Sequence, residues 1–151
     1  MRFFTMAWWV GSQTGAARDV CAEYAAHLGA IRSHLPPDLL ATAESVSLHD
    51  MRLRELRLRI AEATLALGLD SDTGEGRLTL TYSGVEQFES SADPEVGLPG
   101  PAGYGDLGYA EVAALPDGAF EHRLLFSSGI ELVVVFRGFK LQRAQRACPA
   151  L

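Results

Sequence analysis

The chain has 151 residues, of which 48% are hydrophobic and 21% charged, and its formal net charge is −6. These proportions are those of an ordinary globular protein with a single domain, and they argue against a disordered chain. Two cysteines, Cys21 and Cys148, are too few and too far apart for a disulfide framework or a thiolate metal site, so we expect a reduced, cytoplasmic protein.

The N-terminal segment "MRFFTMAWWVG" is rich in bulky apolar residues from Phe3 to Val10. The run is short and Thr5 interrupts it, although a secretory leader with ~7–15 apolar residues is an alternative. We expect its aromatic side chains to belong to the core or to cover a face of a sheet. No later segment approaches the ~20 apolar residues of a membrane-spanning helix, so no membrane partner is expected.

Two helices are predicted before residue 45. Apolar residues recur every three or four positions at Val20, Tyr24, Leu28, Ile31 and Leu35. This spacing predicts a helix over 15–35 that ends before Pro36-Pro37. Asp38 is a suitable N-cap for a second, short helix through residue 43. The helical part of the domain therefore spans about residues 5–45.

The stretch "SLHDMRLRELRLRI" at 47–60 allows two interpretations. As a helix, Leu53, Leu56 and Ile60 would form a stripe. As a strand, apolar and charged residues alternate, with a slip at Arg54-Glu55. The alternation continues into the next apolar segment, which favours the strand. The turn that a strand requires within 59–63 contains neither Gly nor Asn, which favours the helix.

Residues 63–70 and 77–82 alternate apolar and polar side chains on either side of "DSDTGEG" and are predicted to form a hairpin. "VEQF" is expected to extend the second strand past Gly84 through a bulge. "DSDTGE" at 70–75 lacks the Gly and Glu that a calcium loop needs at fixed positions, so a simple turn is favoured. The Pro/Gly-rich segment 90–107 is predicted to be a long functional loop.

Two turns predict the register of the C-terminal strands. "PDG" at 116–118 pairs Val112 with His122 and Glu111 with Arg123. "SSG" at 127–129 independently pairs His122 with Val134. Both registers place Phe120, His122, Leu124 and Phe126 on one apolar face. They place Glu111 and Arg123 on the opposite face, as an opposite-charge pair between strands.

These elements predict one α+β domain over residues 1–151, with N-terminal helices followed by an antiparallel β-meander of about six strands. The sheet is expected over about 47–141 and a basic tail over 142–151.

Four motifs carry a family resemblance: "MRFFTMAWW", "LHDMRL", "LTLTYSGV" and "EHRLLFSSGIELVVVFRGF". Together they resemble a family of small bacterial proteins that is known only as a domain of unknown function. In that family a Leu-His-Asp element, here Leu48 to Asp50, opens the first strand of a meander. The resemblance implies a strand after Asp50, and it implies no activity, cofactor or catalytic residue.

His49, Asp50 and His122 are the candidate catalytic residues. His49-Asp50 is similar to the tandem of metal-dependent phosphohydrolases, but it lies at a strand entrance, where bonds to backbone amides are the more common role. His122 is expected to be a buried histidine with a hydrogen-bond partner, or a general base in a pocket. Convergence of both histidines with Glu111 or Glu131 could make a metal site, but the register sends these carboxylates to the other face. We therefore expect no metal and no cofactor.

Arg52, Arg54, Arg57 and Arg59 indicate a solvated, salt-bridged face rather than a nucleic-acid surface, because the pI is about 5.1 and the run has no aromatic residue. Expected partners are Glu62, Asp70, Asp72 and Glu75.

The sequence favours a small, cytoplasmic, non-enzymatic protein-interaction module. Residues 62–122 hold twelve acidic residues and one base, Arg77, so an acidic surface for a basic partner is expected, as in immunity-type proteins. A homodimer is a further expectation. The alternative is a small hydrolase or ligand-binding domain that uses His49, Asp50 and His122, with loop 90–107 as a lid. Convergence of these side chains on one cavity distinguishes the two.

Overall fold

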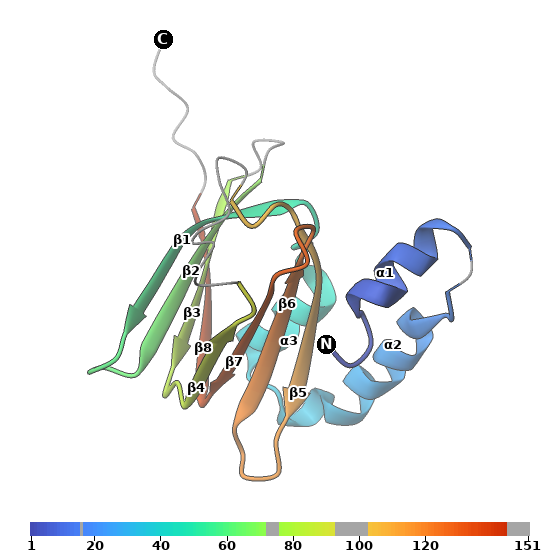
Figure 1. Ribbon diagram of the computed structural model, residues 1–151. Helices are drawn as coiled ribbons and strands as arrows, with labels where there is room; N and C mark the ends of the chain where they lie inside the picture. Colours follow the sequence, from blue (N-terminus) through green and yellow to red (C-terminus); the bar gives the residue numbers. More distant parts are fainter. Residues whose placement is uncertain (16, 72–75, 93–102, 145–151) are drawn as a thin grey trace.

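A computed structural model describes residues 1–15, 17–71, 76–92 and 103–144 (Figure 1). Helices near the N-terminus precede two antiparallel sheets, which confirms the predicted α+β class. The helical elements are α1 (Met6–Gln13), α2 (Val20–Ile31), the 3-10 turn η1 (Arg32–His34) and α3 (Pro37–Ser45). The strands are β1 (Met51–Arg59), β2 (Thr64–Ser71), β3 (Arg77–Ser83), β4 (Gln87–Ser90), β5 (Leu107–Ala114), β6 (Phe120–Phe126), β7 (Glu131–Phe136) and β8 (Gly138–Ala144).

The eight described strands form two four-stranded sheets, in the orders β1-β2-β3-β8 and β4-β7-β6-β5. The count exceeds the expected six because two long strands bend and continue from one sheet into the other. Gly84, at φ +59°, lies between β3 and β4, and Arg137 separates β7 from β8. A Cβ atom at Gly84 would lie 2.9 Å from the Cβ of Arg137, so this corner requires glycine.

Residues 51–59 form a strand, as their alternation predicts, and the slip is a β-bulge. β1 pairs with β2, and the register shifts between Leu53 and Glu55. The bulge explains why the alternation restarts at Glu55. In the turn that follows β1, Ala63 adopts φ 48°, so an alanine takes the left-handed conformation that Gly or Asn usually supplies.

Strands β5, β6 and β7 pair in the register that their turns predict. His122 is the partner of Val112 on one side and of Val134 on the other. Gly118 and Gly129 close the two turns at φ 83° and 88°. Short loops with Gly in the left-handed region thus determine which side chains of β6 face the core.

The helix boundaries differ from the predicted ones for local reasons. α2 begins at Val20 rather than near residue 15, because the Asp19 carboxylate accepts hydrogen bonds from the backbone N–H groups of Cys21 and Ala22. Residues 6–13 form α1, a helix that the aromatic run does not predict. Asp38 lies in the first turn of α3, but it does not cap that helix: its carboxylate accepts from the Leu141 N–H of β8.

The core lies between the two sheets and α3, which packs against β8 and β5 (Figure 1). Helix α2 packs against β5 from the outside, beside α1. The largest fully buried side chains include Tyr82, Phe126, Phe136, Leu39, Leu65, Leu67, Leu80 and Leu124. The two bent sheets and α3 therefore bury the apolar faces of the strands and of the helix together.

Three predicted segments lie partly or wholly outside the described residues. They are the "DSDTGE" turn (72–75), most of the loop 90–107 (93–102) and the end of the basic tail (145–151). Residues 142–144 belong to β8, so the sheet extends past its predicted end at 141. Within the part of the chain that is described, no helix has the length and apolar character needed to cross a bilayer.

Candidate functional site

His49 and Asp50 connect the end of the helical region to both sheets. The His49 Nδ1 donates to the carbonyl oxygen of Gly108 at 2.7 Å, and its Nε2 lies 3.5 Å from Asp50 Oδ1. Asp50 adopts φ 63° and donates its backbone N–H to the carbonyl of Leu107 at 2.9 Å. The expected position at the start of the sheet is correct, but the histidine binds a carbonyl group rather than a backbone amide.

His122 is buried on the inner face of β6, only 1% exposed. Its Nδ1 lies 2.8 Å from the hydroxyl oxygen of Tyr82, which projects from β3 in the opposite sheet. Burial lowers the pKa of His122 from 6.5 to about 4, so the imidazole is neutral near pH 7. The prediction of a buried histidine with a hydrogen-bond partner is thus confirmed.

The Tyr82 contact also determines which ring nitrogen of His122 carries the proton. The Tyr82 hydroxyl is fully buried, and His122 Nδ1 is the acceptor that the described residues offer it. A buried hydroxyl donates its hydrogen where it can, so Nδ1 accepts and the proton of the neutral ring is on Nε2. Every buried side-chain nitrogen or oxygen in the described residues has a hydrogen-bond partner. No partner is found for His122 Nε2, so this atom is not sealed in the core and reaches a cavity.

That cavity, which we call the histidine pocket, has a volume of about 380 Å³ and lies along the free edge of β5. Both His49 and His122 border it. Its other lining residues are Phe4, Tyr24, Thr42, Ala43, Val46, Ser47, Leu48, Gly108, Tyr109, Ala110 and Val112. Asp50 instead borders a neighbouring cleft of about 530 Å³, which His49 also lines. The structure therefore brings the two histidines to one cavity and places Asp50 at the next.

Tyr24 of α2 and Phe4, from the segment that precedes α1, form one wall of the pocket. The Tyr24 hydroxyl accepts from the Val112 N–H at 3.0 Å, and burial raises the pKa of Tyr24 to about 12. Phe4 stacks on Tyr109 with ring centroids 5.0 Å apart. Gly108 is required here, since a Cβ at this position would come within 2.3 Å of the Trp9 ring. Tyr24, Tyr82 and Ala110 carry no signal in the sequence beyond ordinary core periodicity.

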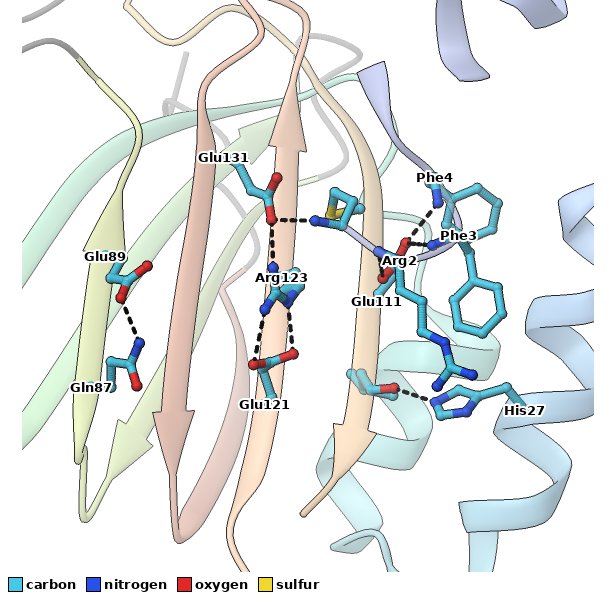
Figure 2. A network of polar contacts seen from close by, with 12 residues as sticks. Arg2, Phe3, Phe4, His27, Gln87, Glu89, Glu111, Glu121, Arg123 and Glu131 are labelled. Carbon is cyan, nitrogen blue, oxygen red and sulfur yellow. Dashed lines mark hydrogen bonds and ion pairs between the residues drawn. The ribbon is translucent and has the colours of Figure 1, made fainter. Parts of the chain in front are cut away.

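Figure 2 shows Glu111 and Glu131 with the N-terminal segment and Arg123 on the outer side of the second sheet. The register of β5, β6 and β7 places both carboxylates on the face opposite His122, as predicted. The Glu111 carboxylate accepts from three backbone N–H groups of residues 2–4, at 2.6 to 2.8 Å. Glu131 contacts the amino group of Met1, and Arg123 binds Glu121 and Glu131. Glu111 and Arg123 are thus register partners, but the expected ion pair between them is replaced by these contacts.

No group of three or more His, Cys, Asp or Glu side chains that could hold a metal ion occurs among the residues that the structure describes. The histidine pocket itself has two imidazoles and no carboxylate in its lining. Its chemistry is therefore that of hydrogen bonding and aromatic contact.

The arginines of β1 have acidic neighbours. Arg52 binds Asp106 at 2.9 Å, and Arg54 lies 3.9 Å from Asp70. Arg57 binds Glu55, and Arg77 of β3 binds the same carboxylate. Of the four expected partners, Asp70 is confirmed and Glu62 is wrong, because the described arginines of β1 bind Asp106, Asp70 and Glu55 instead. Asp72 and Glu75 lie outside the described residues. These contacts support a salt-bridged surface.

No protein-family model and no curated protein matches this chain. The resemblance of its short motifs to a family of small bacterial proteins therefore stays a prediction, and the geometry alone supports the functional proposals.

Proposed function

We propose that this chain is a cytoplasmic, non-enzymatic protein-interaction module that binds its partner along the outer edge of β1. The observation that carries this proposal is a cluster of exposed apolar side chains. Leu56, Leu58 and Ile60 are 37%, 41% and 85% exposed. They make up three of the five large hydrophobic residues that are exposed in the described chain; the others are Met6 and Val10 of α1. Apolar clusters of this kind mark interaction surfaces.

The two apolar residues of β1 continue a buried face to the edge of the first sheet. Leu56 pairs with Leu67 and Leu58 with Leu65, and both partners are fully buried. From Glu55 to Arg59, the described residues pair with the backbone of β1 on the β2 side only. An unpaired, partly apolar edge strand is a template for a further strand.

Side chains bind the outer edges of β5 and β8 at one residue each, in contrast to the outer edge of β1 between Glu55 and Arg59. Tyr24 and His27 of α2 bind the edge of β5 at Val112, each at 3.0 Å. Asp38 of α3 accepts from Leu141 of β8 at 2.9 Å. Folded proteins commonly block their sheet edges in such ways. The open edge of β1 therefore supports a binding role.

The partner we propose is an extended segment of a basic protein. The net charge of −6 attracts a basic partner over long range. Glu62, in the turn beside Ile60, has no ion-pair partner within the described chain. An immunity-type protein that sequesters a basic target is the concrete form of this proposal. The non-enzymatic character is supported by His122, whose Nδ1 lone pair is occupied by Tyr82 and whose Nε2 carries a proton, so neither nitrogen is free to act as a base.

The test is affinity capture from a lysate of the source organism, followed by titration of the purified partner. Leu58→Asp should weaken binding by about tenfold or more, because it places a charge on the docking face. Val10→Asp is the matched control, since Val10 is 55% exposed but lies on α1, and it should bind as the native chain does. The backbone amides of residues 55–60 should become protected from hydrogen exchange when the partner binds.

If affinity capture recovers only this chain, and size-exclusion chromatography shows a dimer, the partner at β1 is a second copy of the chain and not another protein. Equal binding by Leu58→Asp and Val10→Asp would show that β1 is not the interface.

A second candidate function, the binding of a small ligand, is favoured by one observation. His49 and His122 lie far apart in the sequence, yet both border the histidine pocket. This arrangement supports recognition in that pocket, independently of the edge of β1.

A further inference from the structure

The pocket-facing edge of β5 offers an unpaired backbone amide. Val112 directs its N–H to Tyr24 and its C=O to His27, both outside the sheet. Backbone groups along an antiparallel strand alternate, every second residue facing the neighbouring strand. Ala110, two residues before Val112, therefore directs its N–H and C=O to the same outer edge. The described residues provide no contact to these groups, and Ala110 borders the histidine pocket.

The pocket consequently presents donors and an acceptor together. The donors are the Nε2–H of His122 and the N–H of Ala110, and the acceptor is the C=O of Ala110. Ala110 has a small side chain and lines the same cavity as His122. The rings of Phe4 and Tyr109 supply an apolar wall.

The surroundings favour an uncharged ligand. None of the lining residues is Asp, Glu, Lys or Arg, so an ionised ligand would find no counter-charge, and burying a charge without one is costly. Glu111 lies near Tyr24, where its negative charge contributes to the raised pKa of that hydroxyl after the larger effect of burial. Glu111 does not line the pocket, but its negative charge acts at Tyr24, which does, and so disfavours an anion there.

We propose that the histidine pocket binds a neutral amide group. The amide oxygen accepts from His122 Nε2–H and Ala110 N–H, its N–H donates to the Ala110 C=O, and an attached aromatic or apolar group rests against Phe4 and Tyr109. A carboxylate has no hydrogen for the Ala110 C=O, and an ammonium group has no acceptor for the two N–H groups. This inference rests on the ligand-binding candidate above and not on the interface at β1.

Three probes of similar size distinguish these chemistries: benzamide, benzoate and benzylammonium. Each is titrated into the ¹⁵N-labelled full chain, and the Ala110 amide and His122 Nε2 resonances are followed by NMR. Benzamide should shift both resonances in a saturable way. The two ions should bind about tenfold more weakly or not at all, since a factor of ten corresponds to one well-formed hydrogen bond.

Two variants test the assigned contacts. Ala110→Pro removes the edge-facing N–H while keeping the bonds between β5 and β6, and proline is tolerated on an edge strand. Ala114→Pro is the matched control, because Ala114 faces the same edge but does not line the pocket. In the double variant Tyr82→Phe/His122→Leu both hydrogen-bond partners become apolar, so the fold should persist without the Nε2–H donor.

Benzamide binding about tenfold weaker in Ala110→Pro and in the double variant, with Ala114→Pro unchanged, supports the proposal. If Ala110→Pro does not fold, the double variant provides the test. Preferential binding of benzoate or benzylammonium would leave a ligand site in place and overturn its assignment to amides. Shifts of neither resonance with any of the three probes would overturn both the amide assignment and the ligand-binding candidate.

Discussion

Acidification should destabilise this protein through His122. The imidazole is buried and its pKa falls from 6.5 to about 4 in the folded chain, because burial disfavours the charged form. Between pH 6.5 and about pH 4 the unfolded chain binds a proton at this residue and the folded chain does not. The free energy of unfolding therefore decreases as the pH falls from about 6.5 to about 4, and the contribution is complete above this window.

The magnitude follows from the pKa difference. Each unit corresponds to ~1.4 kcal/mol, so the shift at His122 amounts to a loss of about 3 kcal/mol between pH 7 and pH 4. This is a large share of the ~5–15 kcal/mol that stabilises a typical domain. Carboxylates also titrate in this range, so the effect has to be measured as a difference between two proteins.

Urea unfolding at several pH values between 7 and 4 provides the measurement, with the fluorescence of Trp8 and Trp9 as the signal. Both indoles pack edge-on against Tyr109 and report on the joining of α1 to β5. The double variant Tyr82→Phe/His122→Leu lacks the titrating ring and should lose about 3 kcal/mol less than the native chain over the same range. His34→Gln, which alters an exposed histidine, is the control and should retain the native slope.

The reasoning would be refuted if the native chain and the double variant lost the same free energy of unfolding between pH 7 and pH 4. A direct titration of His122 by NMR that placed its pKa near 6.5 in the folded chain would contradict it as well.

Three further predictions concern the contacts of β5 with the N-terminal segment and with α1, and the helix α2. Glu111→Gln should reduce the free energy of unfolding by about 2 kcal/mol, because hydrogen bonds to a charged acceptor contribute ~1.5–3 kcal/mol; Glu89→Gln, at an exposed carboxylate, should change it by less than ~0.5 kcal/mol in the same denaturant experiment. Gly108→Ala should cost about 1–3 kcal/mol and alter the emission of Trp9, which lies 2.3 Å from the added Cβ position. Gly29→Ala, with nothing within 4 Å, should instead stabilise α2 by ~0.5–1 kcal/mol. A destabilised Gly29→Ala, or an unaffected Glu111→Gln, would contradict these assignments.

Local patterns in the sequence determined most of the secondary structure and one register in full. The neighbours of His122 could be predicted because two short turns set the pairing of β5, β6 and β7, and residues close in sequence decide the geometry of a hairpin. The bulge at Arg54-Glu55 was visible for the same reason, as a break in a period of two. The helix α1 was missed because its apolar residues surround the helix rather than forming a stripe.

The tertiary structure alone decided which chemistry these residues can perform. Tyr82 meets His122 because β3 and β6 belong to different sheets that pack face to face, and this contact converts a candidate base into a neutral donor. The charge of Glu111 was predicted to bind Arg123, its register partner, and binds the N-terminal segment instead. The spacing of apolar residues in the sequence predicts which face of a helix or strand carries a given side chain. The partner it finds there depends on how distant segments pack, and that packing sets the protonation and accessibility of the histidine pocket.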